Sequence, residues 1–171
     1  NIVTAKSDAL IKRIEAEGES SPADIFITVD AGRIDRAKKM NLLQNIDTSS
    51  MNIPENYIDK DKKWVGLSKR IRTIIYSKNN VSKNDITMFE DLGKGNWKGR
   101  ICVRSSNNIY NQSLVASLII NHGEKKAEKI IKDIVNNFAR KPSGNDRAQI
   151  TAVAKNECDV AIVNHYYYIM M

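Results

Sequence analysis

Residues 159–168 read Asp-Val-Ala-Ile-Val-Asn-His-Tyr-Tyr-Tyr. The four apolar residues from Val160 to Val163 form a continuous run, which is typical of a strand buried on both faces of a sheet. An Asn-His pair and three tyrosines follow, and these three are half of the six tyrosines in the chain. Phenols grouped at the end of a buried strand indicate a site that uses oxygen donors.

Other segments show the same alternation of strands and helices. Residues 1–4, 24–29 and 101–103 are apolar runs that predict strands. Amphipathic helices are predicted over Ser7–Glu17, with Ser7 as N-cap, and from an Asp30 cap to about Lys39. Short connections between such elements predict a layered α/β protein.

The second half of the chain continues this pattern. A polar loop, 41–63, precedes a long strand-rich segment, Trp64–Ser77, which we expect to take the chain from one lobe to another. Further helices are predicted after the polar stretch 105–113, with Leu114, Leu118 and Ile119 facing inward, over Glu124–Phe138, and from the turn at 142–146 to about Ala154. We therefore expect two α/β lobes, residues 1–73 and 74–171.

Length and composition are those of an ordinary globular protein. The 171 residues are 42% hydrophobic and 27% charged, and no apolar stretch approaches the roughly 20 residues that span a bilayer. The net charge of +7 raises a nucleic-acid hypothesis, but the basic residues are scattered and alternate with acidic ones, as on solvated faces. The chain opens on Asn1 and stops at Met171, directly after the tyrosines, so we expect an internal piece of a longer protein.

Two cysteines lie within or beside strand-like runs. Cys102 and Cys158 are able to form a disulfide in an oxidising compartment, and two buried thiols are equally compatible with their positions. They have no metal-ligand spacing, so both alternatives stay open.

The tyrosines raise a geometric question. Successive side chains of a straight strand face opposite ways, so Tyr166 and Tyr167 can reach one metal only if the strand has ended and the backbone bends. We assign Tyr168 a packing role and expect His165 to point away from the site.

Tyr110 stands in the polar stretch 105–113, where backbone N–H groups at a helix N-terminus favour anions. On local pattern alone, the ring of Tyr110 packs at the helix entry. Arg104 fits either a salt bridge or an anion contact.

Six groups of motifs are distributed along nearly the whole chain. They are Pro22–Phe26; Trp64–Arg72; Trp97–Arg100; Val103–Asn107 with Tyr110–Ser113; Ala139–Arg140 with Gly144–Asp146; and Cys158–Ala161 with Asn164–Tyr167. Together they resemble the periplasmic ferric-iron-binding proteins, which are the soluble receptors of bacterial iron-uptake transporters.

The resemblance implies a periplasmic-binding-protein type II fold, with two α/β lobes and a crossing hinge strand, incomplete in this chain, that closes on Fe³⁺. It implies phenolate ligands at Tyr166 and Tyr167 and a third at Tyr110. It also implies an arginine near the metal or its accompanying anion, such as carbonate; Arg70 is the best match and Arg72 the alternative.

The resemblance also indicates what this chain lacks. Val29 stands where some members have a Glu ligand, which favours the tyrosine-rich branch of the family. A first-strand His or Tyr ligand is expected upstream of Asn1, and the segments that complete the first lobe are expected beyond Met171. We therefore expect this chain alone to bind iron weakly.

The chemistry agrees with such a site. Hard cations favour oxygen donors, and a phenol with an ordinary pKa of about 10 loses its proton more readily beside a cation. Three phenolates neutralise Fe³⁺, a nearby arginine can hold an anion, and protons compete with the metal for the phenolates.

The function implied is that of a monomeric periplasmic receptor which delivers Fe³⁺ to the permease of an inner-membrane ABC transporter. No nucleophile–base pair or carboxylate dyad stands out, so we do not expect an enzyme. Two alternatives stay open: the same fold binding a polyamine or an anion, and a basic nucleic-acid-binding module.

Overall fold

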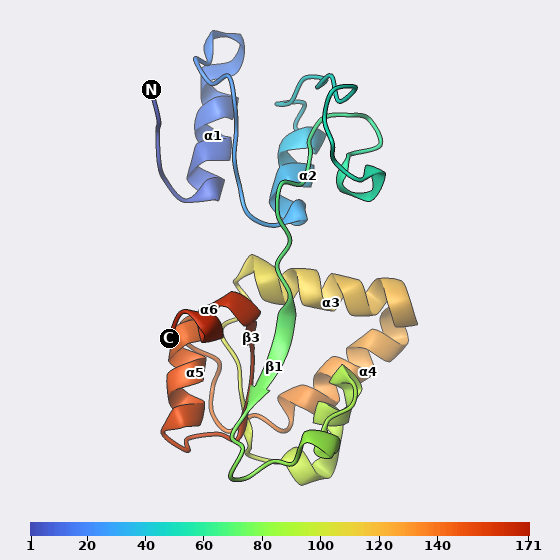
Figure 1. The fold of residues 1–171 in the computed structure, drawn as a ribbon, viewed down its shortest axis with the longest axis vertical. Coiled ribbons are helices and arrows are strands. Elements are labelled where there is room, and N and C mark those ends of the chain that lie inside the picture. The colour runs from blue at the N-terminus through green and yellow to red at the C-terminus, as the bar shows by residue number, and fades with distance from the viewer. The chain divides into compact units, whose positions relative to one another are not determined.

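A computed structural model describes all residues from Asn1 to Met171. The chain forms two compact units, Asn1–Lys69 and Arg70–Met171 (Figure 1). The predicted lobe boundary between residues 73 and 74 falls inside strand β1 (Arg72–Tyr76), which lies wholly in the second unit.

The first unit is helical. Its helices are α1 (Ser7–Glu17) and α2 (Ala31–Lys39), with 3-10 helices at Gly18–Ser20 and Glu55–Tyr57. The predicted cap of α2 is confirmed, because the Asp30 carboxylate accepts a hydrogen bond from Gly32 N–H at 3.0 Å. The predicted N-cap Ser7 is wrong: Ser7 is already helical, and Lys6 precedes α1 without a side-chain cap.

The strands predicted in the first unit are also wrong. Residues 1–4 and 24–29 are not strands, and Ile25 and Ile27 are 80% and 73% exposed. An extended segment becomes a strand only by hydrogen bonding to a neighbour, and this unit contains only the isolated bridge Ile58–Val65. For the same reason the predicted long strand over 64–77 shortens to β1.

The second unit is built on a mixed three-stranded sheet. Its order is β1, β3 (Val160–Asn164), β2 (Ile101–Cys102). Strand β1 is antiparallel to β3, with Arg72 opposite Asn164, and β2 is parallel to β3. The central place of β3 explains why all five of its residues are buried.

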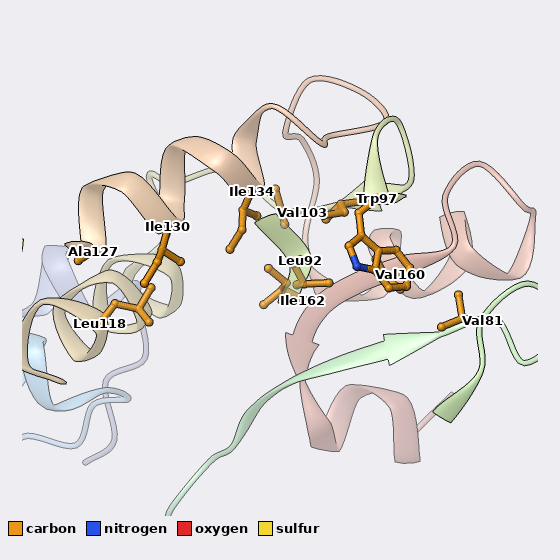
Figure 2. Close-up of a cluster of buried hydrophobic side chains, with 11 residues drawn as sticks. Val81, Leu92, Trp97, Val103, Leu118, Ala127, Ile130, Ile134, Val160 and Ile162 are labelled. Atoms are coloured by element: carbon orange, nitrogen blue, oxygen red, sulfur yellow. The ribbon is translucent and has the colours of Figure 1, made fainter. Parts of the chain in front are cut away.

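Helices cover both faces of this sheet (Figure 1): α3 (Ile109–His122) and α4 (Glu124–Val135) on one, α5 (Asp146–Ala154) on the other. Because side chains alternate along a strand, Val160 and Ile162 join the cluster that includes Leu118 of α3 and Ile134 of α4 (Figure 2). Ala161 and Val163 join the other cluster, with Ile150 and Val153 of α5. Two helical layers therefore account for the unbroken apolar run that the sequence showed.

The helix predictions in this unit are largely confirmed. Helix α4 is amphipathic as predicted and buries Ile130 and Ile134, but it ends at Val135, before the predicted Phe138. The inward position predicted for Ile119 is wrong, since its side chain is 38% exposed while Leu118 is 7% exposed. One helical residue corresponds to about 100° of rotation, so Ile119 lies to the side of the buried stripe that contains Leu118.

Cys102 and Cys158 form a disulfide. This decides between the two alternatives, a disulfide and two free thiols. The disulfide links β2 to the segment before β3, and both residues are buried. Closing a loop across a separation of 56 residues removes chain entropy from the unfolded state worth roughly 4 kcal/mol.

Replacing both cysteines by alanine (Cys102→Ala with Cys158→Ala) is therefore expected to lower the free energy of unfolding by roughly 4 kcal/mol. Urea denaturation of the oxidised protein and the double variant measures the difference. The variant's curve should not respond to reductant, whereas that of the wild type should. Coincident midpoints for the variant and the oxidised wild type would contradict the expected contribution.

Candidate metal site

The bend that two adjacent tyrosines require is present. Strand β3 ends at Asn164, and helix α6 (His165–Ile169) begins at the next residue. On this helix the rings of Tyr166 and Tyr167 lie side by side, with centroids 4.3 Å apart and planes at 36°. The two phenols therefore share one side of α6.

Tyr110 joins them from another element. It is the second residue of α3, and its backbone N–H is capped by the side chain of Asn108 at 3.0 Å. Its hydroxyl hydrogen-bonds the hydroxyl of Tyr166. The fold therefore brings together three phenols from two helices, although Tyr110 and Tyr166 are far apart in the sequence.

The three phenols differ in acidity. Burial and the hydrogen bond to Tyr166 raise the pKa of Tyr110. The hydrogen bond to Tyr166, together with burial, raises the pKa of Tyr167 to about 12. Burial acts to raise the pKa of Tyr166 too, but hydrogen bonds from Tyr167, Tyr110 and Asn164 and the charge of Arg70 outweigh it and lower that pKa. Tyr166 is thus the first of the three to ionise.

Arg70 contacts two of the tyrosines. Its Nη1 donates to the Tyr110 hydroxyl at 3.2 Å, and its guanidinium carbon lies 5.2 Å from the ring centroid of Tyr166. This cation–π geometry places a positive charge beside the phenols. Arg70 is exposed, so its remaining donors are available to an anion.

Arg72 uses its terminal guanidinium donors for hydrogen bonds within the protein. Its side chain is 10% exposed, and Nη1 donates to Asp146 Oδ2 at 2.7 Å and to Asn164 Oδ1 at 3.2 Å. Its Nη2 donates to Asn111 Oδ1 at 2.7 Å. Because these donors are used, the geometry favours Arg70 over Arg72 as the anion-binding residue.

A buried carboxylate lies behind the tyrosines and was not singled out from the sequence. Asp146 is fully buried and also pairs with Arg104 at 3.0 Å. Of the two roles predicted for Arg104, the structure therefore shows the salt bridge. The sequence placed Asp146 at the end of the turn before a predicted helix and in one of the family motifs, without assigning it a role. An Asp in the first turn of a helix is ordinary, and no local signal distinguishes a buried one.

The neighbours of the tyrosine pair have other roles. The packing role assigned to Tyr168 is wrong, because this residue is 60% exposed. It lies two residues, or about 200° of helical rotation, from Tyr166. The Nδ1 atom of His165 accepts a hydrogen bond from Ile71 N–H at 3.2 Å, and its ring meets that of Tyr166 edge to face. The backbone of Ile71, directly before β1, therefore engages this histidine nitrogen.

No other part of the chain forms a comparable donor set. There is no cluster of three or more His, Cys, Asp or Glu residues able to hold a metal. A pocket of about 250 Å³ lies elsewhere in the second unit, and the only one of the site residues that lines it is Arg72. Its walls are mostly apolar and include none of the tyrosines, so it does not compete as a metal site.

The surface charge follows the pattern expected from the sequence. Several lysines pair with carboxylates, as Lys38 does with Asp59 at 2.7 Å and Lys129 with Asp133 at 2.6 Å. None of the helices has both the length and the apolar character needed to cross a membrane.

Comparison with known proteins identifies relatives of the chain. The family model described as bacterial extracellular solute-binding protein matches residues 20–171. Iron uptake protein A2 of Synechocystis sp. is 44% identical over 173 residues, which cover 100% of this chain and 50% of that protein. The major ferric iron-binding protein of Neisseria meningitidis is 28% identical over 169 residues, with 96% and 50% covered. The chain spans about half the length of the curated relatives it matches.

Solved structures agree. The Trichodesmium protein IdiA (FutA), in complex with iron and citrate ligands, is 51% identical with a TM-score of 0.94. The match covers 98% of this chain and 54% of that one. The ferric binding protein from Campylobacter jejuni is 40% identical with a TM-score of 0.92, covering 99% and 55%. These matches confirm the predicted fold class, the type II periplasmic-binding-protein fold.

Proposed function

Because the chain belongs to the bacterial extracellular solute-binding protein family, we propose that it binds ferric iron through the phenolate oxygens of Tyr110, Tyr166 and Tyr167. The observation that carries this proposal is the meeting of three phenol hydroxyls from α3 and α6 in a chain with no other metal-binding cluster. The names of the relatives, which include ferric iron-binding proteins, support it. A solute-binding protein also agrees with the expectation that the chain is not an enzyme.

The chemistry of the cluster suits a trivalent cation. In the metal-free protein, protons bridge the three oxygens, and Tyr166 accepts hydrogen bonds from both partners. A bound Fe³⁺ replaces those protons, and its charge favours the ionised form of each phenol. Three phenolates balance the charge of the ion, and oxygen donors match its hardness.

Membership of the family supports a cellular role for the protein. We place the protein in the periplasm, as a monomer that delivers its iron to the permease of an inner-membrane ABC transporter. The disulfide between Cys102 and Cys158 supports an oxidising compartment. The two units of the chain are proposed to belong to different lobes of the protein.

Arg70 is proposed to hold carbonate or another small anion at an open position on the metal. A guanidinium group binds such an anion through charge-assisted hydrogen bonds. Arg70→Gln is therefore expected to weaken ferric binding about tenfold, the low end for the loss of an outer partner of a metal site, with stability unchanged because Arg70 is exposed. Ferric titration with and without bicarbonate measures the loss.

Arg72→Gln is the matched comparison. It removes one partner of a buried carboxylate and is expected to lower the free energy of unfolding by about 3 kcal/mol. Urea denaturation of both variants separates the roles. If the two variants behave alike in both assays, the different roles assigned to Arg70 and Arg72 are refuted.

A visible absorption spectrum of the full-length protein with added Fe³⁺ tests the proposed function. Phenolate ligation produces a phenolate-to-iron charge-transfer band, which appears as colour. A colourless protein that binds iron, or one that binds none, would overturn the tyrosine site.

A further inference from the structure

The carboxylate of Asp146 has no contact with solvent, and both of its oxygens are hydrogen-bonded. Oδ2 accepts from Arg72 Nη1 at 2.7 Å and from the backbone N–H of Asn164 at 2.8 Å. Oδ1 accepts from Arg104 Nη1 at 3.0 Å. These three partners come from β1, from the end of β3 and from the segment after β2, so one buried group joins all three strands at their site end.

Two of these partners lead to Tyr110. The guanidinium carbons of Arg104 and Arg72 lie 5.5 Å and 6.0 Å from the centroid of the Tyr110 ring. Asn111, the next residue of α3, accepts from Arg72 and donates to the backbone carbonyl of Arg104 at 2.9 Å. The arginines that Asp146 holds therefore flank the Tyr110 ring and anchor the first turn of α3.

The third partner leads to the other two tyrosines. Asn164 is the last residue of β3, and α6 begins at the next residue. Asp146 fixes its backbone N–H, and the Asn164 side chain hydrogen-bonds both Arg72 and the Tyr166 hydroxyl. The position at which α6 leaves the sheet, and so the position of Tyr166, depends on the same carboxylate.

Charge reinforces the geometry. Arg72 and Arg104 are both largely buried, with side chains 10% and 14% exposed, and Asp146 is the anion between them. Without it, two like charges would face each other beside the Tyr110 ring, and buried charges that lose a partner are strongly destabilising.

We propose that Asp146 is a positioning residue for the tyrosine cluster. It holds the α3 segment with Tyr110 and the α6 segment with Tyr166 and Tyr167 at the spacing where their hydroxyls meet. Its effect on iron rests on the proposed function, whereas its effect on the tyrosines themselves does not.

The test compares Asp146→Asn with Asp159→Asn. Asp159 is a matched control, because it lies before β3 in the same unit and its side chain pairs with Arg100 and Asn80, not with any residue of the tyrosine cluster. Three quantities are measured for each protein: the near-ultraviolet circular dichroism of the metal-free form, the ferric affinity, and the charge-transfer band at saturating Fe³⁺. The first requires no iron, and the third reports the geometry of the phenolates rather than the stability of the fold.

Asp146→Asn is expected to change the tyrosine dichroism, to shift the charge-transfer band, and to lower ferric affinity about 10- to 100-fold, as the loss of outer-shell partners does. Asp159→Asn should leave the charge-transfer band and the ferric affinity unchanged; its near-ultraviolet dichroism reports Trp97, because Arg100, the partner of Asp159, lies over that ring. The proposal is overturned if Asp146→Asn keeps the wild-type band and affinity, or if the control changes as much.

Two further outcomes are also decisive. If the wild type shows no charge-transfer band, the proposed function fails, and the metal-free dichroism alone then supports or overturns positioning by Asp146. If Asp146→Asn does not fold, the double variant Asp146→Asn with Arg104→Gln removes one guanidinium together with the carboxylate and avoids the added repulsion. A double variant with the wild-type band and affinity would overturn the proposal, and one with a shifted band and weaker binding would support it.

Discussion

Tyr166→Phe is expected to lower ferric affinity by more than about 100-fold and to weaken the charge-transfer band. Tyr166 is the phenol that accepts hydrogen bonds from both of the others, and its pKa is the one that is lowered. The variant loses a direct ligand, whereas loss of an outer-shell partner alone costs 10- to 100-fold. Competition titration against citrate, followed at the charge-transfer band, measures the change.

Tyr168→Phe is the matched control. It removes the same hydroxyl from the same short helix, but this ring is 60% exposed and belongs to no tyrosine contact of the cluster. Its affinity and spectrum should equal those of the wild type. Unchanged ferric binding in Tyr110→Phe, Tyr166→Phe and Tyr167→Phe would reject the assignment of the metal site.

Ferric affinity is expected to fall steeply as pH falls. Tyr110 and Tyr167 have raised pKa values, about 12 for Tyr167, so both hydroxyls are protonated in the metal-free protein at neutral pH. Binding must displace those protons, and each displaced proton lowers affinity about tenfold per unit of decreasing pH. The two protons on Tyr110 and Tyr167 alone predict a loss of at least roughly 10⁴-fold between pH 7.5 and pH 5.5, and any proton displaced from Tyr166 adds to it.

The measurement is ferric competition with a chelator whose own pH dependence has been calibrated, over pH 5.5 to 7.5. Tyr167→Phe provides the internal check, since removing one of the two protonated phenols should reduce the slope by about one decade per pH unit. An affinity that does not vary with pH would mean that no phenol proton is displaced. Because affinity falls as pH falls, iron is expected to be released in mildly acidic solution.

Local signals account for the elements that were predicted well. Helix α1, the Asp30 cap of α2 and the buried face of α4 depend on residues within a few positions of one another. Strands depend on distant partners, so residues 24–29 have a strand-like composition without being a strand. The same difference explains why β1 is only part of the predicted segment, Trp64–Ser77.

The arginine pair illustrates where local pattern stops being informative. Arg70 and Arg72 stand two positions apart in one motif, and on a continuous strand they would share a face. Strand β1 begins only at Arg72, which pairs with the buried Asp146, 74 positions away. Arg70 precedes the strand and lies over the ring of Tyr166 instead. Their different environments depend on a carboxylate that the sequence does not place near either.

The sequence alone determined that this chain presents oxygen donors, with Tyr166 and Tyr167 adjacent and Tyr110 at a helix entry, and that its motifs resemble those of ferric-iron-binding proteins. Only the tertiary structure decided that the strand ends before the tyrosines, that Tyr110 meets Tyr166, and that Asp146 joins the segments which bear them. The physical reason is distance along the chain: residue type is local, whereas a hydrogen bond between largely buried groups 74 positions apart, such as Arg72 and Asp146, exists only once packing has excluded water and brought their elements together.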